Sequence, residues 1–298
     1  MLPLPALIEA VGRAFDAPPA PAQRLVISDD AGQDWVIMPG LAARGGLLCK
    51  MLRVGDGGGP SDQPTISGVV NLLDGEGRLL SVLDGATLTA RRTAAAAGYA
   101  TQLLAPPRAS VLALFGVGGL AADHLEAIAS VRPLAEIRVV GRSPERLRRF
   151  CEGMGERGYN VRAAAAGEAL DGADLVVTVT TSPEPVFADR DLAAGVHINA
   201  MGSYRPARAE IPAETVKRAR VVVETRASAW HEAGDLIQPR DAGLIDEGHI
   251  YAELHERERL AELRASEPAA VTLFKSVGHV ALDLAALEVY LAALPSPA

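Results

Sequence analysis

The sequence predicts an α/β protein with two domains, in which an α+β domain precedes a Rossmann-type domain with a doubly wound parallel sheet. Three observations support this. The 298 residues exceed the length of one typical domain. Strand and turn signals alternate over the first hundred residues, whereas strands and helices alternate after Pro106-Pro107. Hydrophobic residues make up 49% and charged residues 22%, which is typical of a folded protein and excludes a long disordered chain.

The formal net charge is −8, from 37 acidic and 29 basic residues, and it argues against nucleic acid as the main partner. The two cysteines, Cys49 and Cys151, form no C-x-x-C pair, so neither a disulfide framework nor a zinc site is expected and a reducing cytoplasm is indicated. No basic segment precedes an apolar run near the start, and no stretch of about 18 apolar residues follows. We therefore expect a cytoplasmic protein with no membrane partner.

In the first domain, we expect a helix over residues 5–15 and then a meander of antiparallel strands. Turn signals at 28–32, 55–60 and 74–77 separate the strands. An Ala-rich helix is predicted to start near Thr89 as its N-cap and to end by Pro106. The predicted strands are 24–28, 34–39, 46–54, 66–74 and 79–84.

In the second domain, alternation of strands with helices predicts right-handed crossovers and a parallel sheet. Helices are expected over 120–131 and 143–154, the second with Pro144 in its first turn. We assign residues 1–105 to a substrate-binding and dimerisation domain and 106–276 to the dinucleotide-binding domain, with a helix in 277–298 packing back on the first domain. The predicted strands are 111–115, 136–140, 160–164, 175–180, 197–200 and 220–224.

The strongest motif is a G-x-G-x-x-A loop between a predicted strand and a predicted helix. Gly116 permits a tight turn, Gly118 lets the backbone approach a pyrophosphate, and Ala121 lets the helix lie close to the sheet. The phosphates would then meet the positive end of that helix. The alternative is a simple tight turn, but the strand and helix on either side favour dinucleotide binding.

The end of the next strand indicates which dinucleotide binds. An NAD site normally has an acidic residue there for the ribose 2′-hydroxyl, but residues 139–146 read V-V-G-R-S-P-E-R. Arg142, Ser143 and Arg146 are suited to a 2′-phosphate, which favours NADPH over NAD. The alternative is that both arginines are solvated surface charges.

Basic residues occupy unusual positions in the first domain. Lys50 lies in an apolar strand, on the same face as Leu48 and Leu52, where a desolvated lysine needs an anion or a role in proton transfer. A lysine that faces water from an edge strand remains an alternative. Arg91 and Arg92 open the Ala-rich helix, where the helix dipole disfavours cations, so either an anionic ligand holds one of them or they are surface residues.

The six histidines show no zinc, serine-triad or metal-carboxylate signature, and no metal ion is expected. His231 with Glu232 and Asp235 could form a catalytic cluster, although a helix-capping or solvated role is favoured.

Taken in order, these motifs resemble the ornithine cyclodeaminase/μ-crystallin family over nearly the whole chain. T-x-x-R-T-A-A at 89–95, the dinucleotide loop and F-K-S-x-G at 274–278 are specific in combination, and N-A-M-G-S-Y-R-P at 199–206 also belongs to the resemblance. The resemblance implies a homodimer in which the first domains join their sheets. It also implies that Arg24 and Arg92 bind the substrate carboxylate, with Lys50 beside the reacting carbon and nitrogen. A guanidinium fork would orient that carboxylate.

The residues that we expect to contact the cofactor are Thr93, Gly116, Val117, Gly118, Gly119, Leu120, Arg142, Ser143, Arg146, Thr180, Met201, Gly202, Ser203 and Phe274.

One departure from the family pattern concerns the substrate. Ornithine cyclodeaminases have an aspartate for the distal amine where this chain has Tyr204. The sequence looks more like the ketimine reductase and Δ1-pyrroline-2-carboxylate reductase branch. We therefore expect an NADPH-dependent reductase of a small, cyclic 2-carboxy imine that yields an L-amino acid such as proline or pipecolate. Alternatives are an alanine dehydrogenase-like enzyme, a cyclodeaminase, a biosynthetic imine reductase, or an NADPH-dependent ligand-binding protein without turnover.

Overall fold

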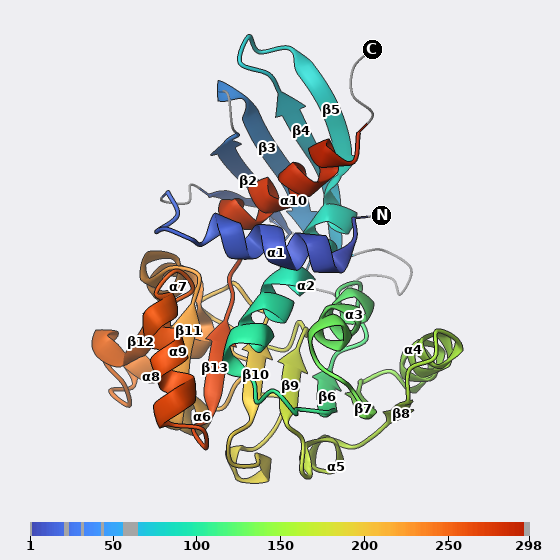
Figure 1. Cartoon of the computed structure of the whole chain (residues 1–298), viewed down its shortest axis with the longest axis vertical. Coiled ribbons are helices and arrows are strands. Elements are labelled where there is room, and N and C mark those ends of the chain that lie inside the picture. Colours follow the sequence, from blue (N-terminus) through green and yellow to red (C-terminus); the bar gives the residue numbers. More distant parts are fainter. Residues whose placement is uncertain (1, 21–23, 31–32, 43–44, 56–64, 295–298) are drawn as a thin grey trace. The chain divides into compact units, whose positions relative to one another are not determined.

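The computed structural model describes residues 2–20, 24–30, 33–42, 45–55 and 65–294. The chain divides into two compact units (Figure 1). Unit 1 comprises Met1–Ala95 and His279–Ala298, and unit 2 comprises Ala96–Gly278. Residues 31–32 and 56–60 of two predicted turns lie outside the described residues.

Unit 1 contains a five-stranded antiparallel sheet in the order β1-β2-β3-β4-β5, which confirms the predicted meander. Helices α1 (Leu4–Ala14) and α10 (Val280–Ala292) lie side by side over one face of this sheet (Figure 1). The strands are β1 (Leu25–Ser28), β2 (Asp34–Leu41), β3 (Leu47–Val54), β4 (Ile66–Leu73) and β5 (Leu79–Asp84).

Alternation along the strands gives the sheet a buried face and an exposed face. Met38, Leu48, Leu52 and Val70 point to the buried face, which the helices cover. The opposite face keeps large apolar side chains in contact with solvent, and Trp35 and Leu41 are 48% and 78% exposed. Other exposed apolar residues of the sheet are Leu25, Val26, Ile27, Leu47, Val69, Leu79, Leu80 and Val82. An apolar surface of this kind is typical of an interaction face.

Helix α2 (Gly85–Leu104) begins four residues before Thr89, so the predicted N-cap is wrong. The Oδ1 atom of Asp84 accepts the Thr87 N–H at 2.7 Å and supplies the cap one turn earlier, while Thr89 is buried inside the helix. Arg91 and Arg92 consequently lie beyond the first turn, where the helix dipole has little effect. The division between the units falls within α2, after Ala95.

Unit 2 contains an eight-stranded sheet in the order β12-β11-β13-β10-β9-β6-β7-β8, and every neighbouring pair is parallel. The order reverses between β6 and β9, which is the position where doubly wound sheets bind ligands at their carboxyl ends. The predicted strands are present as β6 (Val111–Phe115), β7 (Glu136–Val140), β8 (Val161–Ala163), β9 (Leu175–Thr178), β10 (His197–Ala200) and β11 (Arg220–Val223).

Two further strands were not predicted from the sequence. Strand β12 (Ile250–Glu253) forms one edge of the sheet, and β13 (Thr272–Lys275) inserts between β10 and β11 although it comes last in the chain. The helices are α3 (Ala121–Val131), α4 (Pro144–Glu156), α5 (Ala166–Leu170), α6 (Ala213–Arg218), α7 (Arg226–Glu232), α8 (Gly234–Asp241) and α9 (Arg257–Ser266). Among the described residues, no helix has both the length and the apolar character needed to cross a membrane.

Candidate active site

The G-x-G-x-x-A loop joins β6 to α3 at the switch point of the unit 2 sheet. Gly116 has φ +109°, and an added Cβ would lie 2.7 Å from the Val179 carbonyl oxygen, so this turn requires glycine. A Cβ on Gly118 would meet no atom within 4 Å, which leaves its backbone open to a ligand. Ala121 is fully buried where α3 starts. These features fit a pyrophosphate at the start of α3.

The end of β7 carries the residues predicted to contact a ribose phosphate. Arg142 and Arg146 are exposed, and the Ser143 hydroxyl caps α4 by accepting the Arg146 N–H at 3.4 Å. Gly141 lies close to the dinucleotide loop, since an added Cβ would come within 3.2 Å of the Val117 side chain. The two loops are therefore adjacent, and the arginines are not fixed by burial.

A buried carboxylate ties together the loops that follow β9 and β10. Glu210 Oε1 accepts the N–H and the hydroxyl of Thr180, both at 2.7 Å, and Oε2 accepts the Gly202 N–H at 2.7 Å. An added Cβ on Gly202 would lie 2.3 Å from the Thr180 carbonyl oxygen, so only glycine fits. Burial raises the pKa of Glu210, and Asp235 adds to this effect while Lys275 opposes it. Glu210 therefore positions two residues of the expected cofactor set, Thr180 and Gly202.

A second buried pair supports the same loops. The Lys275 ammonium lies 2.8 Å from Asp235 and donates to the Ser203 carbonyl at 2.7 Å, and both side chains are fully buried. Asp235 also accepts the backbone N–H groups of Glu210 and Ile211. The helix-capping or solvated role favoured for Asp235 is thus wrong, because its carboxylate lies in the core. His231 is exposed.

Two other residues of the expected cofactor set, Met201 and Phe274, lie in this unit. Met201 follows β10 and is buried, and its N–H donates to the Thr178 carbonyl at 2.9 Å. Phe274 is fully buried within β13. Thr93 lies in unit 1 and is buried within α2.

Unit 1 holds a separate buried cluster around Lys50, which we call the Lys50 cluster. The Lys50 ammonium donates to both carboxylate oxygens of Asp283, at 2.8 and 2.7 Å, and both side chains are fully buried. Arg92 Nε lies 3.1 Å from Asp283 Oδ1. Strand β3 is the central strand of its sheet, so the alternative of an edge-strand lysine that faces water is wrong.

The charges of the Lys50 cluster shift its titration. Burial is the largest cause that lowers the pKa of Lys50, and the charges of Arg92 and Arg24 also lower it. Asp283 opposes the shift, and the pKa that results is about 7. Burial alone would raise the pKa of Asp283, but Lys50, Arg92 and Arg24 hold it below its usual value. A lysine that titrates near neutral pH, beside two arginines, can give a proton to an anionic ligand.

The two adjacent arginines of α2 have different roles. Arg91 donates to the Leu2 carbonyl, at 2.6 Å from Nη2, and so ties α2 to the start of the chain. Arg92 faces Asp283 instead. The substrate-binding role that the resemblance implies for Arg92 stays a prediction.

Asp283 and His279 were not predicted as site residues. Asp283 is the lone acidic residue in the apolar run V-A-L-D-L-A-A-L at 280–287, and a single carboxylate in such a run needs a cationic partner. The sequence therefore indicates that Asp283 has a cationic partner, but it does not indicate that the partner is Lys50. His279 caps α10, with its Nδ1 accepting the Ala281 N–H at 3.1 Å.

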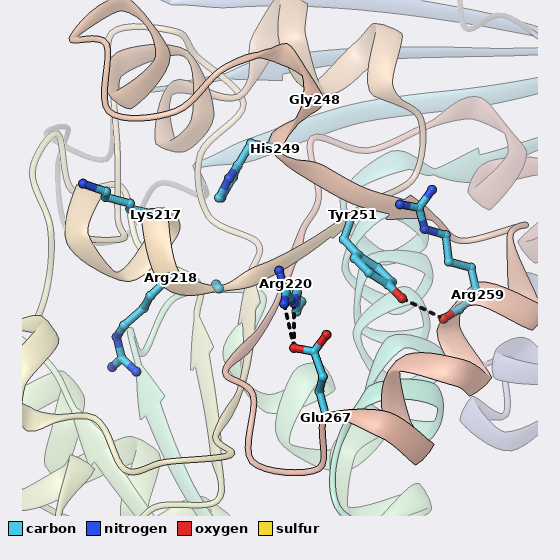
Figure 2. A pocket seen from close by; sticks show the side chains of 9 residues that line it. Lys217, Arg218, Arg220, Gly248, His249, Tyr251, Arg259 and Glu267 are labelled. Carbon is cyan, nitrogen blue, oxygen red and sulfur yellow. Dashed lines mark hydrogen bonds and ion pairs between the residues drawn. The ribbon is translucent and has the colours of Figure 1, made fainter.

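A basic hollow of about 390 Å³ lies elsewhere in unit 2 (Figure 2). It surrounds the amino end of β11. The dinucleotide loop follows the carboxyl end of β6, and because the strands are parallel, the hollow and the loop lie at opposite ends of the strands. Arg220 pairs with Glu267 at 2.7 Å and Arg218 pairs with Asp189 at 2.8 Å, so protein carboxylates already neutralise much of the charge. The hollow takes no part in the candidate active site. Its lining residues are Lys217, Arg218, Ala219, Arg220, Gly248, His249, Tyr251, Arg259 and Glu267.

The doubly wound sheet and its glycine loop define unit 2 as a Rossmann-type dinucleotide-binding unit, carried on a chain whose unit 1 holds a buried cationic cluster. The chain belongs to the ornithine cyclodeaminase/mu-crystallin family, whose model matches residues 9–293. This confirms the resemblance seen in the sequence motifs.

Individual relatives agree with this assignment. A Delta(1)-pyrroline-2-carboxylate reductase of Bacillus cereus is 37% identical over 226 residues, which cover 74% of this chain and 69% of the relative. A Delta(1)-pyrroline-2-carboxylate/Delta(1)-piperideine-2-carboxylate reductase of Azospirillum brasilense is 34% identical over 293 residues, covering 96% and 90%. The structure of Thermococcus litoralis Delta(1)-pyrroline-2-carboxylate reductase, in complex with NADH and L-proline, matches with a TM-score of 0.89 at 30% identity, covering 97% of this chain and 92% of that one.

Proposed function

We propose that the protein is an NAD(P)H-dependent reductase of small 2-carboxy imines such as Δ1-pyrroline-2-carboxylate or Δ1-piperideine-2-carboxylate. The observation that carries this proposal is the Lys50 cluster, in which a fully buried lysine with a pKa of about 7 contacts Asp283 while Arg92 lies against the same carboxylate. An anion bound by arginines beside a proton donor fits a carboxylated imine. The named relatives act on the same class of compound.

Each residue of the cluster, together with Arg24, whose charge acts on Lys50, has a defined role in this proposal. Arg24 and Arg92 hold the carboxylate and fix the orientation of the C=N bond. A bound reduced nicotinamide supplies the hydride that adds to the imine carbon. Lys50 gives one proton to the imine nitrogen, so that the C=N double bond becomes a CH–NH single bond and an L-amino acid forms. Asp283 keeps the ammonium of Lys50 oriented, and solvent restores the proton.

For the cofactor, we propose a preference for NADPH. Support comes from Arg142 and Arg146, which are both exposed after β7, and from the lack of an acidic residue between Val140 and Ser143. The Thermococcus litoralis enzyme was solved with NADH, so the proposed preference for NADPH rests on the residues of this chain alone.

We also propose that two chains associate through the exposed face of the unit 1 sheet. Trp35 and Leu41 of β2, Leu47 of β3 and Val82 of β5 offer apolar surface there. Burying such a face removes apolar area from water, at about 25 cal/mol per Å². The family resemblance implies the same joining of sheets.

The experiment follows reduced-nicotinamide absorbance while the purified protein is mixed with NADPH or NADH and each cyclic imine. Oxidation coupled to formation of proline or pipecolate is expected. Turnover that requires pyruvate and ammonia would instead indicate an amino-acid dehydrogenase, and ammonia release from ornithine or lysine without added reductant would indicate a cyclodeaminase. Cofactor binding with no turnover of any of these compounds would leave a ligand-binding protein and overturn the enzymatic proposal.

A further inference from the structure

His279 is a buried histidine at the N-cap of α10, beside the Lys50 cluster. Its side chain is 1% exposed, and its ring meets Phe15 edge-on with ring centroids 6.3 Å apart. It precedes Asp283 by four positions, so the N-cap and Asp283 both belong to the start of α10. The charges of Arg24, Asp283 and Arg92 all act on His279, in keeping with this position.

The hydrogen bond at the cap determines where the ring carries its proton. Nδ1 accepts the Ala281 N–H, so in the neutral ring the hydrogen must lie on Nε2. Burial is the largest cause that lowers the pKa of His279, Arg24 and Arg92 also lower it, and Asp283 opposes them. The pKa that results is about 4, so the ring is neutral at pH 7. His279 is therefore a hydrogen-bond donor through Nε2 and contributes no net charge.

The Nε2 atom is buried, and it has no hydrogen-bond partner within the part of the chain that the structure describes. An unsatisfied buried donor costs about 1–3 kcal/mol, a cost that a bound acceptor recovers. Asp283 is the carboxylate whose charge acts on His279, but Lys50 and Arg92 already engage its oxygens. The acceptor that suits this N–H is thus an oxygen of a ligand that the neighbouring arginines attract.

We propose that His279 Nε2–H donates a hydrogen bond to the carboxylate of the bound imine and that His279 is thereby a specificity-determining residue. This inference rests on the proposed function, because it takes the substrate carboxylate to lie beside Arg24 and Arg92. The neutral ring strengthens carboxylate binding without adding a third positive charge beside Lys50, whose pKa two arginines already lower. A substrate with a carboxylate is favoured over the corresponding amide or the unsubstituted ring, since those leave the N–H or an arginine unsatisfied.

Two substitutions separate substrate binding from helix capping. His279→Asn keeps an N-cap acceptor for the Ala281 N–H but lacks the ring that places Nε2, whereas His279→Phe keeps a ring against Phe15 and loses both the cap and the donor. We expect both variants to raise the KM of the imine about tenfold with little change in kcat, since the lost contact is made equally before and during the reaction. The melting temperature should fall for His279→Phe and stay near the wild-type value for His279→Asn.

A matched control is His197→Asn. His197 is also fully buried, and its Nδ1 bonds to Thr272, but it lies at the amino end of β10 in unit 2. This variant should leave the KM of the imine unchanged, whatever its effect on the melting temperature.

Calorimetric binding of pyrrole-2-carboxylate, which has no imine to reduce, tests the inference apart from turnover. The cofactor-loaded wild type should bind it, and both His279 variants should bind it about tenfold more weakly. If the imines are not reduced but this difference holds, the proposed function fails and the carboxylate contact stands. Equal affinity in wild type and variants, or no binding to the wild type, would overturn the inference.

Discussion

Lys50 and Asp283, which are 233 residues apart in the sequence, form a buried ion pair. The ammonium donates to both carboxylate oxygens, at 2.8 and 2.7 Å, and neither side chain is exposed to solvent. A buried pair of this kind costs free energy through desolvation and is weak grounds for a stabilising role. Its position beside Arg92 instead indicates a chemical role, which the predictions below test.

Replacement of Lys50 by Met should remove the proton donor while keeping an unbranched apolar side chain on the buried face of β3. Imine reduction should fall about 10²- to 10⁴-fold. Cofactor affinity, measured by fluorescence quenching, should stay within about twofold, because the dinucleotide loop belongs to unit 2. An unchanged rate would remove Lys50 from the mechanism.

The pH dependence of kcat/KM should reflect Lys50. Imine reduction needs the protonated ammonium, so the rate should fall as pH rises through about 7, the pKa of Lys50 in the folded protein. Asp283 raises that pKa, so Asp283→Asn should move the fall to lower pH. The difference between the two profiles isolates the enzyme group from the titration of the imine itself. Identical profiles would argue against coupling of the two residues.

The cofactor preference depends on Arg142 and Arg146. The double substitution to Ala should raise the KM of NADPH about tenfold or more and leave that of NADH nearly unchanged, because only NADPH carries the 2′-phosphate. Arg148→Ala serves as the control, since Arg148 is exposed on the same helix and pairs with Glu152. Equal effects on both cofactors would mean that the arginines do not contact the phosphate.

Glu210→Gln should loosen the loops after β9 and β10. The amide nitrogen of Gln cannot accept the backbone N–H that the carboxylate accepts now, and each donor left unsatisfied costs about 1–3 kcal/mol. We expect a lower melting temperature and a higher KM of the cofactor, while the fall in rate near pH 7 keeps its position. The exposed Glu152→Gln should change none of these.

Association through the sheet face is tested with Trp35→Lys. The charge should disfavour burial of the exposed apolar face and halve the mass measured by light scattering, while the circular dichroism spectrum stays the same. Leu244→Lys is the control, because Leu244 is exposed to a similar degree, 41% against 48% for Trp35, but lies in unit 2. A wild-type monomer, or a Trp35→Lys dimer, would contradict the proposal.

Local signals in the sequence predicted most of the fold and the dinucleotide loop. The two-residue period of β3 placed Lys50 on the same face as Leu48 and Leu52, and the glycine spacing identified the loop between β6 and α3. The insertion of β13 between β10 and β11 was not predicted, because sheet order depends on packing between distant segments. Asp283 was missed for the same reason, since its partner lies far away in the sequence. The start of α2 was missed because Asp84 and Thr89, five positions apart, are both good capping residues.

Unit 1 is assembled from both ends of the chain, and this affects the order in which the protein can be completed during synthesis. Lys50 leaves the ribosome long before Asp283, so its counter-ion is absent until the second segment of unit 1, which begins at His279, emerges. Unit 2 is continuous and can fold first, as domains generally do during translation. A chain that stops at Gly278 would therefore retain the dinucleotide-binding unit but lack both the acid that pairs with Lys50 and one of the two helices that cover the unit 1 sheet.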